Sequence, residues 1–189
     1  MRKDELRKQM PQQKRQFTPQ QLEELSLPII ARLKERLKDA RTILAYYSLP
    51  DEVNTHSLVD ELLAEGKTVL LPKVVDADTM VICRYTGPHD LQEGVLHLME
   101  PIGEPFTAYG DIDVVVVPGM AFDAQGHRLG RGRGYYDRFF TLHSSFFTLH
   151  SSLFTLHSSL FTTFGVCFDF QKVPEVPTDA NDIPVDEVI

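Results

Sequence analysis

The sequence predicts an α/β fold, a single three-layer domain with a mainly parallel sheet and helices on both faces. Short apolar segments alternate with segments of helical periodicity, which is the pattern of βαβ units. Val114 to Val117 are four successive valines, as expected for a strand covered on both faces. No linker-like stretch divides the 189 residues, so residues 1–189 are expected to form one domain.

The first 40 residues are expected to form two helices. The second begins where Thr18 can cap, Pro19 suits the first helical position and Gln21 completes a capping box. Apolar residues then recur at helical spacing, at Leu22, Leu25, Ile29, Ile30, Leu33 and Leu37. A further helix is expected over 55–65, closed by Gly66.

The remaining apolar segments are expected to be strands. In chain order these segments are 42–47, 68–72, 80–85, 113–118, 164–170 and 183–188. A long loop rich in glycine and arginine follows the strand at 113–118 and leads into a helix that begins near Tyr135. Because open α/β sheets bind ligands at the carboxyl ends of their strands, this loop is the first place to look for a site.

Composition narrows the function classes. The chain has 42% hydrophobic and 24% charged residues, as in ordinary globular proteins, and no apolar run reaches the roughly 20 residues that span a bilayer. The charged N-terminus does not resemble a signal peptide, and Cys83 and Cys167 are expected to be core residues. We therefore expect a cytoplasmic protein without a membrane partner. The net charge of −8 argues against nucleic-acid binding.

Three nearly identical seven-residue copies, beginning TLHSS, fill residues 141–161. Their apolar residues step by four and three, which is compatible with a heptad seam on a helix that continues from YYDRFF, although serine and threonine are mediocre helix formers. His143, His150 and His157 lie seven apart, too far along a helix to share one metal ion. The segment is expected to be an excursion from the domain that favours self-association of an otherwise monomeric protein.

Residues 128–138 read RLGRGRGYYDR. Glycines let backbone N–H groups converge on an anion, the following helix adds its positive N-terminal end, and the arginines add charge. These features predict a cradle for a polyphosphate, most simply ATP. The segment lacks the Gly-Lys-Ser/Thr ending of a Walker A loop and the spacing of the dinucleotide fingerprint. Asp137 either holds Mg²⁺ against the phosphates or favours the helix dipole, and the sequence leaves both open.

The segment PGMAFDAQGHRLGRGRGYYDRF, residues 118–139, resembles the signature of the 5-formyltetrahydrofolate cyclo-ligase (methenyltetrahydrofolate synthetase) family. Shorter segments follow in the order of that family, namely KDELR, DEVNT, LPKV, MEP, GVCFDFQ and NDIPVDEV. The resemblance covers nearly the whole chain except the repeats. It implies an ATP- and Mg²⁺-dependent ligase that converts 5-formyltetrahydrofolate to 5,10-methenyltetrahydrofolate through a phosphorylated formyl group and releases ADP and phosphate.

The same resemblance implies the site residues. Those implied for ATP are Lys3, Arg7, Arg128, Leu129, Gly130, Arg131, Gly132, Arg133, Gly134, Tyr135 and Tyr136. Those implied for the folate are Tyr47, Glu52, Arg131, Gly132, Arg133, Gly134 and Tyr135, with Arg131 and Tyr135 in catalytic roles. Those implied for Mg²⁺ are Asp137 and Asp182. On residue type alone, Lys3 and Arg7 also suit a solvated helix end, and Tyr47 a half-buried strand position.

Two alternatives remain open at this stage. A catalytically silent relative would bind nucleotide or folate without turnover, and the insertion at 141–161 beside the predicted ATP residues keeps that alternative in view. An interaction protein would use the arginine loop for a partner and the repeats for assembly. The favoured interpretation has reduced folate and ATP as its small-molecule partners.

Overall fold

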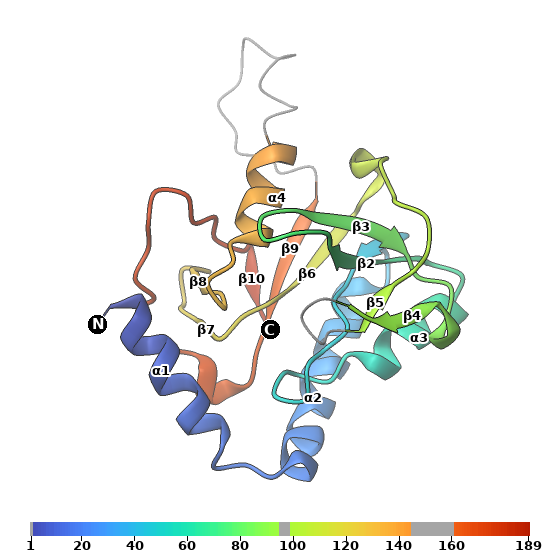
Figure 1. The fold of residues 1–189 in the computed structure, drawn as a ribbon. Coiled ribbons are helices and arrows are strands. Elements are labelled where there is room, and N and C mark those ends of the chain that lie inside the picture. Colours follow the sequence, from blue (N-terminus) through green and yellow to red (C-terminus); the bar gives the residue numbers. More distant parts are fainter. Residues whose placement is uncertain (1, 95–98, 145–160) are drawn as a thin grey trace.

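The computed structural model describes residues 2–94, 99–144 and 161–189 (Figure 1). Its α-helices are α1 (Lys3–Lys14), α2 (Pro19–Leu37), α3 (His56–Ala64) and α4 (Tyr135–Ser144). Its strands are β1 (Thr42–Leu44), β2 (Thr68–Val74), β3 (Met80–Arg84), β4 (Leu91–Glu93), β5 (Met99–Pro101), β6 (Val114–Pro118), β7 (Ala121–Phe122), β8 (Arg128–Leu129), β9 (Thr162–Val166) and β10 (Glu187–Val188). The expected heptad seam, with His150 and His157, lies outside the described residues apart from its two ends.

The central sheet has six strands in the order β10-β9-β6-β1-β2-β3, and every neighbouring pair is parallel except β2 and β3. The expectation of a mainly parallel sheet is therefore confirmed. The β2–β3 pair is antiparallel because a tight turn joins the strands. In that turn the Asp76 carboxylate accepts hydrogen bonds from the backbone N–H groups of Asp78 and Thr79.

Helices cover both faces of this sheet. Alternate strand residues point to opposite sides, so Ile43 packs in one buried cluster and Leu44 in another. The first cluster includes Leu33 of α2 and Leu62 of α3, and the second includes Phe139 of α4. This arrangement gives the predicted three layers.

A third, smaller cluster fixes the N-terminal helix. Leu6 and Met10 of α1 pack against Ala121 of β7 and Leu129 of β8, and Figure 1 shows α1 beside this small hairpin. The cluster holds the basic start of α1 next to the glycine-arginine loop.

Several boundaries differ from the expected ones. The segment 164–170 leaves the sheet after Val166 and continues as a 3₁₀ turn at Asp169–Gln171, while only Glu187–Val188 of 183–188 pairs as a strand. The β1 strand is likewise shorter than 42–47, because Tyr46 and Tyr47 have left the ladder and line a cavity. The hairpins β4–β5 and β7–β8 were not expected, since strands of two or three residues are too short to show a periodic pattern.

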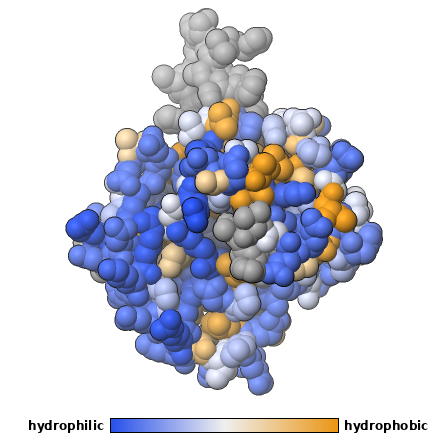
Figure 2. All heavy atoms as spheres, in the orientation of Figure 1, coloured by the Kyte–Doolittle hydropathy of each residue, from blue (hydrophilic) through white to orange (hydrophobic). Residues whose placement is uncertain are grey.

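The two cysteines occupy core positions, as expected. Cys83 and Cys167 are free and buried, and burial raises the pKa of Cys167 to about 12. None of the helices in the described ranges combines the length and the apolar character that crossing a bilayer requires. The face drawn in Figure 2 is mostly hydrophilic, with its apolar residues in small separate groups.

Candidate active site

A cavity of about 480 Å³ lies at the carboxyl ends of β1 and β6. Strand β2 lies on one side of β1 in the sheet, and the later strand β6 lies on the other side of β1. The strand order therefore reverses at β1, and open α/β sheets bind ligands at such a topological switch point. The start of α1, the segment after β1, the loop from Arg128 to Asp137 and the region near Asp182 all line the cavity. One wall is apolar and includes Pro72, Val74 and Met80.

The segment expected to be one long loop contains the β7–β8 hairpin. The buried Asp123 carboxylate organises its turn by accepting hydrogen bonds from the backbone N–H groups of Gln125 and His127 and from Val176. These hydrogen bonds lower the pKa of Asp123 even though burial by itself would raise it. The glycine-arginine loop itself is therefore short and spans 130–134, between β8 and α4.

Two glycines give this loop its shape. Gly132 has φ = 98° and Gly134 has φ = 67°, a region that other residues adopt only with strain. Gly134 directly precedes α4, and the first amides of a helix have no intrahelical acceptor. The loop and the N-terminus of α4 thus face the cavity with N–H groups suited to an anion.

Arg128 is built into the fold. Its side chain is 6% exposed, its Nη2 donates to both Asp137 oxygens at 2.9 Å, and its guanidinium lies 5.5 Å from the centre of the Tyr136 ring. Arg128 Nε and the Tyr136 hydroxyl are buried and have no partner in the described part of the chain. Burial also raises the pKa of Tyr136. Both residues line the cavity, but Arg128 is already committed to Asp137.

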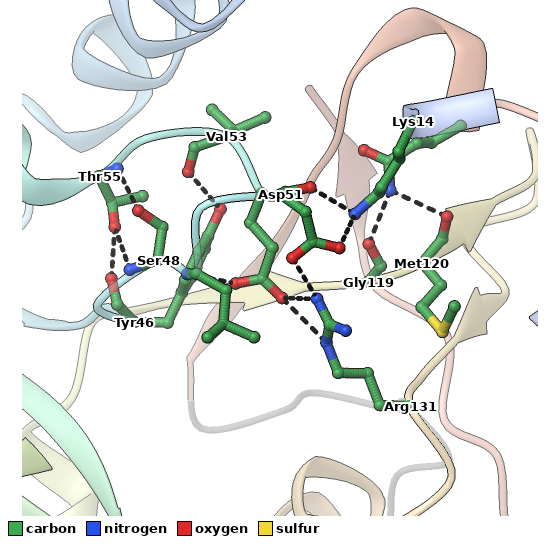
Figure 3. Close-up of polar contacts among 12 residues, drawn as sticks. Lys14, Tyr46, Ser48, Asp51, Val53, Thr55, Gly119, Met120 and Arg131 are labelled. Atoms are coloured by element: carbon green, nitrogen blue, oxygen red, sulfur yellow. Dashed lines mark hydrogen bonds and ion pairs between the residues drawn. The ribbon is translucent and has the colours of Figure 1, made fainter. Parts of the chain in front are cut away.

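Arg131 lies in the glycine-arginine loop, and its side chain reaches the segment after β1 (Figure 3). Its Nη2 donates to Asp51 Oδ1 at 2.7 Å, and its Nε and Nη2 donate to Glu52 Oε1 at 3.2 and 3.0 Å. The other Glu52 oxygen accepts from Leu49 N, and Lys14 of α1 donates to Asp51. The loop and the predicted folate carboxylate thus meet in one ion-pair network.

The remaining cations of the cavity differ in their partners. Lys3 donates to Asp179 and Asp182, and these hydrogen bonds raise the pKa of Lys3 against the opposing effect of burial. Arg7 donates to the Gly130 carbonyl and pairs with Asp4. Among the described residues, no side-chain partner is found for Arg133. Arg133 is therefore the cavity arginine that can meet an anion without leaving a carboxylate.

The loop is also tied to the β2–β3 turn. The Tyr135 hydroxyl donates to the Asp76 carbonyl at 2.9 Å, and Arg138 donates to the carbonyls of Asp78 and Arg133. The Arg138 guanidinium lies 5.4 Å from the centre of the Tyr135 ring. These contacts place Tyr135 at the cavity wall, with its hydroxyl engaged by the fold.

The predicted magnesium residues meet at the cavity. Asp137 and Asp182 both line it, and the Ile183 amide, next in the chain to Asp182, lies 3.5 Å from Asp137 Oδ1. In the described ranges no group of three or more metal-ligating side chains occurs. Two carboxylates in the lining of one cavity are compatible with Mg²⁺, because this ion commonly takes one or two carboxylates and completes its shell with phosphates and water.

Tyr47 has a partner that the sequence did not indicate. Its ring stacks on His56 with the ring centres 3.8 Å apart, and burial raises the pKa of Tyr47. Tyr47 and Glu52 also line a second cavity of about 430 Å³ on the α2 side, so these residues stand between two cavities.

Sequence reasoning missed four charged residues around the cavity: Lys14, Asp51, Glu100 and Asp179. Glu100 is 4% exposed and accepts a hydrogen bond from Val74 N. Two signals were available. Lys14 follows Lys3 and Arg7 at helical spacing, and Asp51 is the neighbour of Glu52.

Comparison with known proteins gives one consistent result. The model of the family described as the 5-formyltetrahydrofolate cyclo-ligase family matches residues 1–189. The chain is 28% identical to the 5-formyltetrahydrofolate cyclo-ligase of Escherichia coli, over 94% of each chain. It is 32% identical to that of Mycolicibacterium smegmatis, over 79% of this chain and 73% of the relative. Among solved structures, Aquifex aeolicus 5,10-methenyltetrahydrofolate synthetase is similar with a TM-score of 0.78 and 33% identity, over 100% of this chain and 89% of that one.

Proposed function

The chain belongs to the 5-formyltetrahydrofolate cyclo-ligase family, and from this premise we propose that it converts 5-formyltetrahydrofolate and ATP to 5,10-methenyltetrahydrofolate, ADP and phosphate. The observation that carries the proposal is the cavity at the switch point. It combines an anion-binding loop, the N-terminus of α4 and a carboxylate, Glu52, within reach of Arg131. We propose one domain over residues 1–189, with 141–161 as an excursion.

The two substrates are proposed to meet at the tip of the loop. ATP phosphates lie against the backbone of 130–134 and the start of α4, near Lys3, Arg7 and Arg133. Arg128 is buried, so it adds charge beside this region rather than a flexible contact. The pterin presents N–H donors to Glu52, and Tyr47 and the apolar wall contact its ring.

The chemistry requires charge stabilisation and positioning. The formyl oxygen attacks the γ-phosphorus of ATP, ADP leaves, and the formyl carbon becomes electrophilic. Folate N10 then attacks that carbon, its N–H proton is released, and the C–O bond breaks as phosphate departs. We propose that Arg131 and the loop amides neutralise charge on the transferred phosphoryl group and that Tyr135 acts beside them, which is supported by the presence of all these residues in the cavity lining.

Asp137 and Asp182 are the residues we propose for Mg²⁺. Bound there, the ion would neutralise phosphate charge. Both carboxylates now hold cations of the protein, Arg128 and Lys3 respectively. Engagement of Asp182 with the ion therefore requires Lys3 to turn toward the phosphates, which suits the ATP-binding role proposed for Lys3. Asp137 would bind the ion through the lone pairs that Arg128 leaves free, so that Arg128 stays in place.

A spectroscopic assay tests the proposal. Purified protein is mixed with 5-formyltetrahydrofolate, ATP and Mg²⁺, and the methenyl product is followed by absorbance, with ATP omitted as the control. ATP-dependent product is expected. Folded protein that binds ATP but forms no product would instead be a silent relative, and removal of 141–161 would then show whether the repeats are responsible. The cytoplasmic location and the self-association of the repeats remain predictions.

A further inference from the structure

Arg131 is shared between two carboxylates that are held in different ways. Glu52 projects into the cavity, and one of its oxygens is fixed by the Leu49 amide. Asp51 does not line the cavity, and it is fixed by Lys14 of α1. Figure 3 shows the chain of contacts from Lys14 through Asp51 to Arg131.

Lys14 is an unusual residue to find in the interior. Its side chain is only 5% exposed, and its ammonium donates to both the carbonyl and the carboxylate of Asp51, with 3.1 Å to Oδ2. Burying an ammonium group is unfavourable unless it is paired and hydrogen-bonded. Both groups that accept from Lys14 belong to Asp51, so the pairing fixes that one residue.

The two carboxylates must behave differently when folate binds. In the proposed function, Glu52 receives the pterin donors, which compete with Arg131 for Glu52 Oε1. Asp51 Oδ1 remains available to Arg131, because Lys14 occupies the other oxygen and keeps the carboxylate in place. The hydrogen bond to Asp51 then keeps the Arg131 guanidinium in place, while contacts with the substrates replace the contact between Arg131 and Glu52.

We propose that Lys14 and Asp51 are positioning residues, a fixed anchor that keeps Arg131 over the cavity during turnover while Glu52 serves the folate. This inference rests on the proposed function. It assigns to Lys14 a role in the reaction although the residue is buried and does not line the cavity.

Lys67 provides a matched control. Lys67 directly precedes β2, and its ammonium ties this segment to the end of α2 by donating to the carbonyls of Leu37, Lys38 and Ala40. Lys67 does not line the cavity. Lys67→Met therefore removes a lysine that only supports the fold. Its turnover should match that of the unaltered protein at temperatures where both are folded.

The kinetic experiment compares Lys14→Met, Asp51→Asn, the double variant and Lys67→Met. We expect kcat to fall by about 10-fold or more in Lys14→Met and Asp51→Asn, the scale on which misplaced catalytic groups reduce rates. KM for 5-formyltetrahydrofolate should change by less than about 3-fold, because Glu52 is intact. The double variant should be no slower than the slower single variant, since both changes remove the same anchor. An unchanged kcat in Lys14→Met, or losses that multiply in the double variant, would overturn the proposal.

A second measurement does not depend on activity. Trypsin cleaves after arginine and must bind the arginine side chain, so cleavage after Arg131 requires that its ion pairs open. The Arg133 side chain, in the same loop, has no partner among the described residues, so cleavage after Arg133 serves as the internal reference. In Lys14→Met the rate of cleavage after Arg131 relative to Arg133 should rise several-fold, with no rise in Lys67→Met. If the ratio of cleavage after Arg131 to cleavage after Arg133 were the same in all variants, the proposal that Lys14 and Asp51 anchor Arg131 would be wrong. If the unaltered protein is inactive but this ratio rises as expected, the proposed function fails and the anchor stands.

Discussion

The hairpin and the loop that follow β6 are adjacent in sequence and opposite in character. We call residues 121–129 the stem and residues 130–134 the tip. Arg128 in the stem is 6% exposed and locked against Asp137, whereas Arg131 in the tip is 45% exposed and shared between Asp51 and Glu52. Three positions along one motif thus separate a buried arginine from one that a ligand can engage.

This difference indicates how the site divides its tasks. The stem packs against α1 through Leu129 and against the central sheet through Phe122, so its residues set the position of everything after them. The tip is held by the ion pairs of Arg131 with Asp51 and Glu52. A charged ligand can take the place of one partner in such a pair without disturbing the hydrophobic core. Stem substitutions should therefore change stability first, and tip substitutions should change turnover first.

The largest effect is expected from Arg128→Met. Removing one partner of a buried ion pair leaves the other uncompensated, which costs about 3 to 5 kcal/mol, and we expect about 3 kcal/mol because Asp137 keeps 21% of its side chain exposed. This loss of stability is measured as the change in the free energy of unfolding in chemical denaturation. Arg128→Met combined with Asp137→Asn should recover part of the loss. Unchanged stability together with lost ATP binding would show that Arg128 is a phosphate ligand, and the contrast between stem and tip would fail.

Arg131→Ala tests the tip. If Arg131 neutralises phosphoryl charge, turnover should fall by about 10²-fold or more, on the scale of losing an oxyanion donor. The unfolding free energy should change by less than about 1 kcal/mol, because partly exposed ion pairs contribute little to stability. Steady-state kinetics and denaturation of the same preparation separate the two quantities. Near-normal turnover would remove Arg131 from the mechanism.

Local patterns predicted most of the fold, and the glycine-arginine loop that they singled out lines the main cavity. The valines of β6, the cap at Thr18 and the glycine spacing before α4 are each visible within a few residues. The division of roles between Arg128 and Arg131 was not predictable in this way. The acceptor of Arg128 is nine residues away, but those of Arg131 are 79 and 80 residues away and are brought near only by the sheet.

The same reason explains why Lys14 was missed. Its place on one face of α1 with Lys3 and Arg7 is a local pattern, but its burial depends on Asp51, which lies 37 residues further on, in the segment after β1. A lysine on an amphipathic helix is usually solvated, so the pattern alone favours a surface position. Tertiary placement gives this residue its function in the proposed mechanism.

Glu52→Gln sharpens the contrast on the substrate side. Glutamine keeps the size of the side chain but presents a neutral acceptor to the pterin donors, so KM for 5-formyltetrahydrofolate should rise by about 10-fold, on the scale of one charge-assisted hydrogen bond. ATP affinity should stay within about 3-fold, because Asp51 still holds Arg131. Titration of each substrate at saturating levels of the other gives both values. Equal losses for both would mean that Glu52 holds the tip together rather than the folate.

The smallest expected effect is the pH dependence of the stability that Asp51 contributes. Burial by itself would raise the pKa of Asp51, but the charges of Lys14 and Arg131 outweigh it and lower the pKa. A carboxylate with a lowered pKa stabilises the folded state above its ordinary pKa of about 4, and this contribution is lost as the pH falls through the lowered value. The unaltered protein should therefore be more stable than Asp51→Asn by about 1 kcal/mol at pH 7, because the Asp51 side chain is 43% exposed and the buried Lys14 ammonium keeps the backbone carbonyl of residue 51 as an acceptor. The difference should vanish near pH 2. A difference that persists in acid would mean that Asp51 acts through its shape and hydrogen bonds, and the anchor of Arg131 would then not depend on charge.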